Sequence, residues 1–443
     1  VMLLCYSPHS GSLFSGRRRS GKAVLVLLLS LPVLLLVMAL AFYAAELVET
    51  RTLLRNDADA AALAAVQTFV DDSLLCNDPQ RMKELISLAR QNAQQYAELN
   101  LVQGQGLYLD LNASNDPDGD IVVGALAQPR AKEFMLPNET AHSDPAWLHI
   151  NTVRVTSRRQ AQHPNGPVYL HNGPLLSRLP NNIAAAATAT LDRYVIGFRP
   201  LGRQPLPLCP LALFSFLPGN LKHCWEFNVE KRRGADDYKV RRNGAYYQIL
   251  RGADRLHEMD VYLGVGEEMG QTRKANPRDL NLQLRQGKFN CCLLYFGASD
   301  VQELALQIVN GVDASHLSAF GGQLVLGPGN QLVVNGTPWG PQNTSWKGQL
   351  LQEALKQLQS SGLPRLWPCF SSFDKETSHP VLCGFVAARV VQVKRQAGKG
   401  EAISFAVQPC MMAAGTAVTE VGRAGIGMAK LPNPYICKVR LVE

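Results

Sequence analysis

Residues 20–67 read SGKAVLVLLLSLPVLLLVMALAFYAAELVETRTLLRNDADAAALAAVQ, and they decide how the chain is organised. No charged residue occurs between Ala23 and Ala45, and only Ser30 and Pro32 interrupt the apolar run. Because a helix rises about 1.5 Å per residue, a run of this length crosses the roughly 30 Å hydrocarbon core of a bilayer. We therefore predict a membrane-anchoring helix over residues 23–45, represented by Ala23, Leu28, Pro32, Leu36 and Ala45.

Two other interpretations of the apolar run stay open. A cleaved signal peptide shares a basic start, but its apolar region is only about 7 to 15 residues long and a small-residue cleavage site follows it. A buried core helix is the other interpretation. Pro32 predicts a kink inside the helix and not its end, because neighbouring groups satisfy the carbonyl that proline leaves unbonded.

The flanking charges predict an orientation. The topology signal consists of Arg17, Arg18, Arg19 and Lys22, and no acidic residue occurs before Glu46. Since cytoplasmic flanks are rich in Lys and Arg, we predict a single-pass protein of the cytoplasmic membrane, with its N-terminus cytoplasmic and the chain after Glu46 extracytoplasmic. The same segment has the Gly-x-x-x-x-Gly-Lys spacing of a phosphate-binding loop. Ala23 follows where a hydroxyl is needed, so we expect no nucleotide site.

Helical spacing of apolar residues continues from Leu47 to Ala65, so we expect one helix to project well beyond the bilayer. Its Ala-rich face would allow close packing against another copy or a partner, or simply against its own domain. A distinctive pattern lies in this part of the helix, at Asn56, Asp57, Asp59, Ala60, Ala61 and Leu63.

Three features together resemble the N-terminal segment of TadE/TadG-like proteins of the tight-adherence (Flp) pilus system. They are this pattern, the basic start at 17–21 and Leu31-Pro32. Beyond residue 200 the chain is more loosely similar to the long form of planctomycete-like bacteria. The resemblance implies a non-enzymatic, membrane-anchored pilus-assembly component without a cofactor. Its N-terminal helix would meet pilus-assembly or envelope proteins, or further copies of itself.

One position departs from the related prepilins. Prepilins carry a Glu five residues after the Gly at which the leader is cleaved. Counting from Gly21, that position is Val26 in this chain. The resemblance therefore implies a retained scaffold or accessory component and not a filament subunit.

The predicted fold class is α+β, with an N-terminal transmembrane helix that continues into a long helix and is followed by a strand-rich exported domain. Asp78 and Pro79 have the pattern of an N-cap and first residue of a second helix. From Leu107 the apolar period changes to two, which predicts short strands, the first at 107–111. The expected ranges are a cytoplasmic segment 1–22, the membrane helix 23–45, a helical stalk 46–98, a Tad-like α+β domain 99–199, a Pro-rich linker 200–218 and a strand-rich domain 219–443.

Local patterns predict further elements in the second half. The five prolines between residues 200 and 218 predict a linker or an extended crossover. Apolar runs on both sides of Gly327–Asn330 predict a hairpin. A shared apolar face predicts a helix over Gln349–Gln359, and alternating or continuous apolar runs predict strands within 380–395, 401–409 and 435–443.

The composition sets limits on function. With 46% hydrophobic and 18% charged residues, the chain is not a disordered one. The net charge of the chain is +8, and four of its positive charges belong to the topology signal. The rest of the chain therefore has a net charge of +4. A basic cluster at Lys231–Arg242 also contains Asp236 and Asp237, which favours a solvated hairpin surface, so we expect no nucleic-acid partner.

Ten cysteines suggest disulfides in an exported domain. Cys5 is cytoplasmic in the predicted topology, and an odd number of nine remains. Spacing suggests three pairs among the later cysteines, namely Cys209 with Cys224, Cys369 with Cys383, and Cys410 with Cys437. No Cys-x-x-Cys pair occurs, so we expect no zinc.

Searches for catalytic and metal motifs give weak matches. Asp116–Asp120 begins like a calcium loop but has Ala127 in place of the final Glu, which favours a tight turn. Asp313–Leu317 lacks the last Ser of a D-x-S-x-S metal site, and His257-Glu258 lacks the second His of a zincin helix. We expect no metal or catalytic site. Two other functions stay open: an anchored adhesin or binding module unrelated to pili, and an exported hydrolase.

Overall fold

The computed structural model describes residues 20–126, 134, 136, 150–169, 180–216, 222–244, 246–265, 276–341, 345–394, 403–420 and 432–442. Cys5 and the three arginines of the topology signal lie outside these residues. The chain divides into two compact units, Val1–Arg55 with Arg158–Ala185, and Asn56–Ser157 with Ala186–Glu443. One long apolar N-terminal helix and a strand-rich remainder make this a mixed α+β protein, as predicted.

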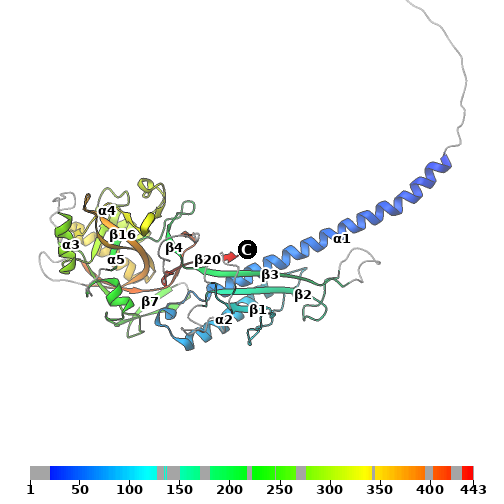
Figure 1. Cartoon of the computed structure of the whole chain (residues 1–443), viewed down its shortest axis with the longest axis horizontal. Helices are drawn as coiled ribbons and strands as arrows, with labels where there is room; N and C mark the ends of the chain where they lie inside the picture. Colours follow the sequence, from blue (N-terminus) through cyan, green and yellow to red (C-terminus); the bar gives the residue numbers. More distant parts are fainter. Residues whose placement is uncertain are drawn as a thin grey trace, which may run out of the picture. The chain divides into compact units, whose positions relative to one another are not determined.

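Helix α1 (Ser20–Gln67) runs for 48 residues without interruption (Figure 1). Pro32 lies inside it and does not end it, and the helix continues well past residue 45, as predicted. By length and composition, it is the one helix among the described residues that is long and apolar enough to cross a membrane.

A short 3₁₀ turn, η1 (Asp72–Cys76), leads to helix α2 (Pro79–Leu99). The predicted start is confirmed, because the Asp78 side chain accepts hydrogen bonds from the backbone amides of Gln80 and Arg81. The buried face of α2 consists of Met82, Leu85, Ala89, Ala93 and Ala97.

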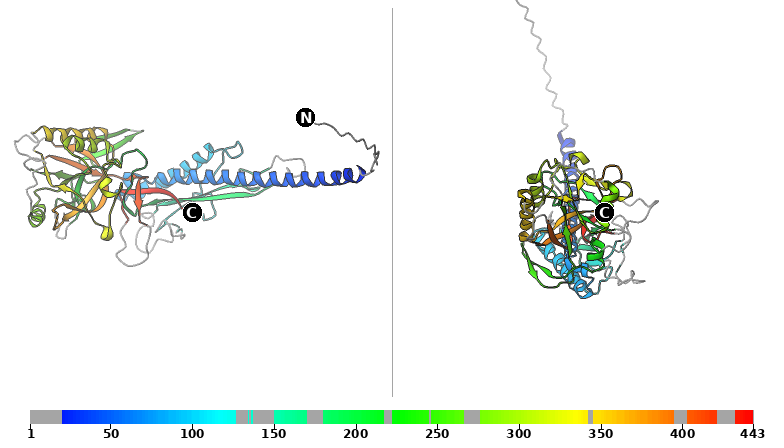
Figure 2. Two further views of the ribbon diagram at one scale, coloured as in Figure 1. Left: turned by 90° about the horizontal axis from the view of Figure 1, so that it is seen from above. Right: turned by 90° about the vertical axis from the view of Figure 1, so that its left-hand side faces the viewer.

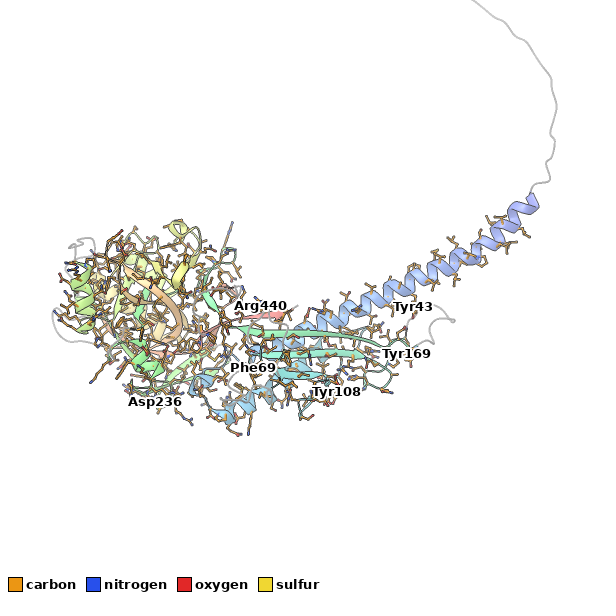
Figure 3. The ribbon with its side chains drawn as sticks, in the orientation of Figure 1. Tyr43, Phe69, Tyr108, Tyr169, Asp236 and Arg440 are labelled. Carbon is orange, nitrogen blue, oxygen red and sulfur yellow. The ribbon has the colours of Figure 1, made fainter. Side chains whose placement is uncertain are left out.

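The first sheet contains five strands in the order β1-β2-β3-β20-β18. Their bounds are β1 Ile121–Gly124, β2 Thr152–Arg159, β3 Ile183–Asp192, β18 Met412–Ala413 and β20 Ile436–Val442. Strand β20, at the red end of the chain, lies antiparallel to β3 (Figure 1). Its outermost ion pair joins Arg440 Nη1 to Asp192 Oδ2 at 3.3 Å, and Arg440 is labelled in Figure 3. The C-terminal strand therefore completes a sheet that begins more than 300 residues earlier, at β1.

The second sheet has eight strands, with the order β13-β10-β5-β15-β16-β17-β8 and β12 paired to β16. Their bounds are β5 Leu211–Phe214, β8 Met259–Tyr262, β10 Cys291–Leu294, β12 Leu332–Val333, β13 Gly336–Thr337, β15 Arg365–Phe373, β16 Pro380–Val393 and β17 Ser404–Pro409. Helices α4 (Val301–Asn310) and α5 (Trp346–Ser361) pack on each other, and α5 also packs on β16 (Figure 2). The predicted helix at 349–359 and the strands within 380–395, 401–409 and 435–443 are confirmed.

The remaining elements are short. Strands β4 (Val195–Phe198), β11 (Leu324–Val325) and β19 (Ala417–Thr419) form a three-stranded sheet, and β9 (Gly264–Val265) pairs with β14 (Trp339–Gly340). Strands β6 (Tyr238–Asn243) and β7 (Tyr246–Arg251) form a hairpin, and the single turns are η3 (Glu226–Glu230), η4 (Ser318–Phe320) and η5 (Pro328–Asn330). Helix α3 (Pro277–Arg285) contacts β15.

Two local predictions were wrong. The apolar runs around Gly327–Asn330 do not pair with each other: β11 pairs with β4, and β12 pairs with β16. Residues 107–111 form no ladder, because the Leu107 amide bonds to the Ala97 carbonyl and the Asp110 amide to the Asp120 carboxylate.

The Pro-rich segment also differs from the expected linker. It contains β5, whose four residues are buried between β10 and β15. The prolines flank this strand, where their missing amides cost no ladder bond, and the Pro210 carbonyl still accepts a bond from the Leu294 amide.

Candidate functional site

The first part of α1, which we call the outer segment (residues 25–42), exposes large apolar side chains in nearly every direction. Leu28 is 63% exposed and Leu36 is 59% exposed. Pro32 and Ala45 are also exposed, while Ala23 and Lys22 lie within the described helix. Monomeric soluble proteins seldom expose a continuous apolar surface of this extent, so the outer segment is the first candidate for an interaction surface.

Just after the outer segment, α1 has a polar contact within its own unit. The Tyr43 hydroxyl donates to Asn181 Oδ1 at 2.7 Å, and Tyr43 is labelled in Figure 3. Thr50, two turns beyond, is buried, and its hydroxyl donates to the Glu46 carbonyl.

The later part of α1, which we call the inner segment (residues 54–66), is buried by the chain itself. Its fully buried side chains are Leu54, Ala58, Ala61, Ala62, Ala65 and Val66. Of the other residues of the family pattern, Asp57 is buried, Asp59, Ala60 and Leu63 are half-buried, and Asn56 is exposed. The Ala-rich face therefore packs against its own domain, one of the three arrangements that the sequence allowed.

Asp57 is the chemically unusual residue of this pattern. It is only 1% exposed, and Oδ2 accepts a hydrogen bond from Ser157 Oγ of β2 at 2.5 Å. No hydrogen-bond donor among the described residues reaches Oδ1. Burial raises the pKa of Asp57 to about 7, although the bond from Ser157 acts in the opposite direction. Asp57 is thus poised to gain or lose a proton near neutral pH.

The sequence prediction missed the burial of Asp57. It lies three residues after Leu54 and four before Ala61, which places it on the same face of the helix as these buried residues. A carboxylate at a core position of the helix was the available signal in the sequence.

The segment proposed as a calcium loop is organised by an amide. Asn112 Nδ2 donates to the carbonyls of Asp116 and Ile121, and the Gly119 amide bonds to the Asp116 carbonyl, which closes the turn. The turn interpretation is confirmed. Among the described residues, no group of three or more His, Cys, Asp or Glu side chains is arranged to hold a metal ion.

The disulfide prediction is contradicted. None of the nine cysteines within the described residues forms a disulfide. Cys369 and Cys383 lie on paired strands, but the Cys383 thiol donates to the Cys369 carbonyl at 3.5 Å. The Cys437 thiol points to the Met412 carbonyl in the same way. Cys209, Cys224 and Cys410 are buried as reduced thiols.

The sulfur environments of three of these thiols disfavour the thiolate form. Cys209, Cys291 and Cys292 cluster around β5 and β10 in the core of the eight-stranded sheet. Burial raises the pKa of each of these thiols, and that of Cys209 reaches about 12. A thiol with a raised pKa is a poor nucleophile and a poor metal ligand.

The polar residues of the two segments that only weakly matched metal-site motifs, His257-Glu258 and Asp313–Leu317, stabilise loops. His257 Nδ1 bonds to the Gly234 carbonyl, and Glu258 accepts the backbone amides of Asp237 and Tyr238. Asp313 Oδ1 accepts the backbone amides of Ser315 and His316. Of the basic cluster, Lys239, Arg241 and Arg242 lie exposed on the hairpin β6–β7, whereas residues 231–233 lie in the turn after η3. Asp236, labelled in Figure 3, fixes the base of the hairpin by accepting the amides of Asp254 and Arg255.

Comparison with family models, with curated proteins and with solved structures finds no match for this chain. The resemblance to TadE/TadG-like proteins stays a prediction from the sequence.

Proposed function

We propose that this protein is a single-pass, non-enzymatic component of tight-adherence pilus assembly, anchored in the cytoplasmic membrane by residues 23–45. The observation that carries the proposal is the change of environment along α1. One uninterrupted helix passes from exposed Leu and Val side chains to a buried face of Ala side chains. The same residues carry the resemblance to the pilus proteins.

Energetics favour a membrane around the outer segment. Removing apolar surface from water stabilises by about 25 cal/mol per Å², so a helix with many exposed Leu side chains is strongly driven into an apolar phase. Backbone groups inside a continuous helix are bonded to each other, which a bilayer requires. The two sheets and their helices are then carried on the extracytoplasmic side, in the orientation that the basic residues before the helix favour.

A role as a retained assembly component also accounts for the inner segment. Its Ala-rich face is already occupied by the chain's own domain, so contacts with envelope proteins or with other copies would use the outer segment. Helices pack in membranes through small residues and close van der Waals contact, and the outer segment offers Ala39 and Ala41 for this purpose.

Deletion of the gene in the source bacterium tests the pilus function. We expect loss of surface pili, restored by the wild-type chain but not by the variant Leu28→Arg/Leu36→Arg. The matched control Leu99→Arg changes an exposed leucine of α2 and is expected to restore pili. Normal piliation in the deletion strain, with loss of attachment to a surface, would instead support an anchored adhesin.

The anchor is tested separately by mass spectrometry of the protein left in membranes after alkaline extraction. We expect peptides from residues 1–22 to be present. A mature N-terminus after residue 45 would identify a cleaved signal peptide, and an N-terminus at Lys22 would identify a processed prepilin.

A further inference from the structure

A cavity of about 230 Å³ lies within the unit formed by residues 56–157 and 186–443. Parts of the chain that are far apart in sequence line it: the η1–α2 connection, the segments around η3 and before β8, and the ends of β17 and β20. About half of its wall is apolar, contributed by side chains such as Leu75, Met82, Met411 and Tyr435. Its charged lining consists of Arg193, Arg232 and Arg255 against Asp78 and Glu230, and His257 adds a further polar side chain.

Arg193 is the unusual member of this lining. It lies in the β3–β4 connection, and its carbonyl accepts the Asn433 amide, which fixes the backbone there. Its Nε is buried and has no hydrogen-bond partner, and no ion pair with Arg193 occurs among the described residues. Burial lowers the pKa of Arg193.

The acidic residues of the cavity are occupied elsewhere. Asp78 Oδ1 caps helix α2, and Asp78 Oδ2 faces Arg255 Nη1 at 3.7 Å. Burial raises the pKa of Glu230, and its side chain hydrogen-bonds to that of Tyr435. The sequence between Glu420 and Pro432 has no acidic residue.

The other cations are also engaged. Arg232 Nη2 donates to the Leu75 carbonyl at 3.2 Å, and His257 bonds to the Gly234 carbonyl. Arg193 is left as a half-buried positive charge, with its Nε buried and with no anion paired to it among the described residues. An uncompensated buried charge is strongly unfavourable, and a bound anion would offset it.

We infer that this cavity binds a carboxylate carried on a small apolar body, with Arg193 as the group that pairs with the carboxylate. One unpaired arginine fits one negative charge, and a planar guanidinium matches a carboxylate through two parallel hydrogen bonds. The apolar half of the wall receives the body of the ligand. The cavity is smaller than the roughly 300–1,000 Å³ typical of drug-sized ligands, so the bound group has the size of one or two amino-acid residues. This site is independent of the proposed pilus function.

A carboxylate of this kind occurs in a free organic acid and at the C-terminus of a peptide. Three compounds distinguish these sources by calorimetry with the full chain in detergent: N-acetyl-leucine, N-acetyl-glycyl-leucine and N-acetyl-leucine amide. We expect both acids to bind and the amide to bind at least tenfold more weakly. Tighter binding of the dipeptide assigns the site to a peptide C-terminus, and tighter binding of N-acetyl-leucine assigns it to a free acid.

The matched variants are Arg193→Gln and Arg199→Gln. Arg199 is exposed, bonds to Gln323 and does not line the cavity. We expect Arg193→Gln to weaken the binding of the acids at least tenfold and Arg199→Gln to leave it unchanged. Arg193→Gln should keep or raise the Tm of the ligand-free protein, because it removes an uncompensated charge, so loss of binding is not loss of folding.

Three results would overturn the inference. They are equal binding of the acid and its amide, equal binding by Arg193→Gln and the wild type, and no binding of either acid at millimolar concentration. Inorganic phosphate serves as a fourth ligand: if it binds and the acids do not, the assignment to carboxylates is wrong.

Discussion

The outer and inner segments of α1 belong to one helix and are both rich in apolar residues, yet they have opposite environments. The outer segment carries Leu and Val around its whole circumference, and these side chains are exposed. The inner segment carries Ala on one face and polar residues on the other, and the Ala face is completely buried. Helix propensity is high in both, so it does not distinguish them. The two segments differ in side-chain size and in the arrangement of polar residues. These differences decide which segment packs on protein and which segment stays exposed.

Arginine in the outer segment should give the largest effect. A charged residue at the centre of a membrane helix costs about 2.5–3.5 kcal/mol on insertion scales, so Leu28→Arg/Leu36→Arg should move the protein from the membrane to the soluble or aggregated fraction. Alkaline extraction followed by immunoblotting measures this. Leu99→Arg is the control, and an unchanged membrane fraction for the double variant would contradict the anchor.

The pH dependence of stability tests the buried carboxylate of the inner segment. Since the pKa of Asp57 is raised from 3.8 to about 7, the folded state holds its proton in a range where the unfolded state has lost it. Stability should therefore fall as pH rises from about 4 to 7, by up to about 4 kcal/mol, and remain low above that range. Asp57→Asn should remove this contribution to the slope. Urea unfolding of the full chain in detergent at pH 5 and pH 8 measures it, and equal slopes for wild type and variant would contradict the burial.

Overpacking tests the fit of the alanine face. Ala61→Leu adds three carbons where no space is left and should destabilise by about 1–3 kcal/mol. Gln67→Leu, at an exposed position of the same helix, is the matched control and should stay within about 0.5 kcal/mol. If Ala61→Leu were as stable as the control, the inner segment would not be packed in this way.

Ser157→Ala should give the smallest change. Its hydroxyl bonds to the ionised form of Asp57 and so lowers the pKa of that residue. Without the bond, the pKa of Asp57 should rise further, and the pH at which stability falls should move upward by about one unit or less. The carboxyl-carbon chemical shift of Asp57, followed by NMR against pH, gives the midpoint directly. A midpoint that moves downward would reverse the assigned role of Ser157.

The comparison also shows what the sequence alone could supply. Patterns within one element were sufficient to predict α1, the cap of α2 at Asp78, α5 and the long strands β16 and β20. They failed where the partner of a strand lies far away in sequence. The runs at 324–325 and 332–333 look like two arms of a hairpin, but each finds a better-matched neighbour in a different sheet.

The candidate sites show the same limit. The exposed apolar run of α1 was evident from the sequence, because twenty-odd residues without a charge need no tertiary context. Asp57 and Arg193 were not recognised, since each becomes unusual only through burial beside segments that the sequence separates by about one hundred residues or more. The disulfide prediction failed for the same reason, because spacing along the chain does not set the direction of a thiol.

Strand β20 has a consequence for the order of folding. The edge of β3 that it covers is synthesised more than 200 residues before β20 itself. Until β20 emerges, β3 presents unpaired backbone amides and carbonyls, which readily pair with strands of other molecules. The large eight-stranded sheet lies between the two in sequence and can fold on its own contacts in the meantime. Loss of residues 436–443 should thus leave the eight-stranded sheet folded and expose the unpaired edge of β3. Nascent or truncated chains would therefore depend on a chaperone more than chains that contain β20.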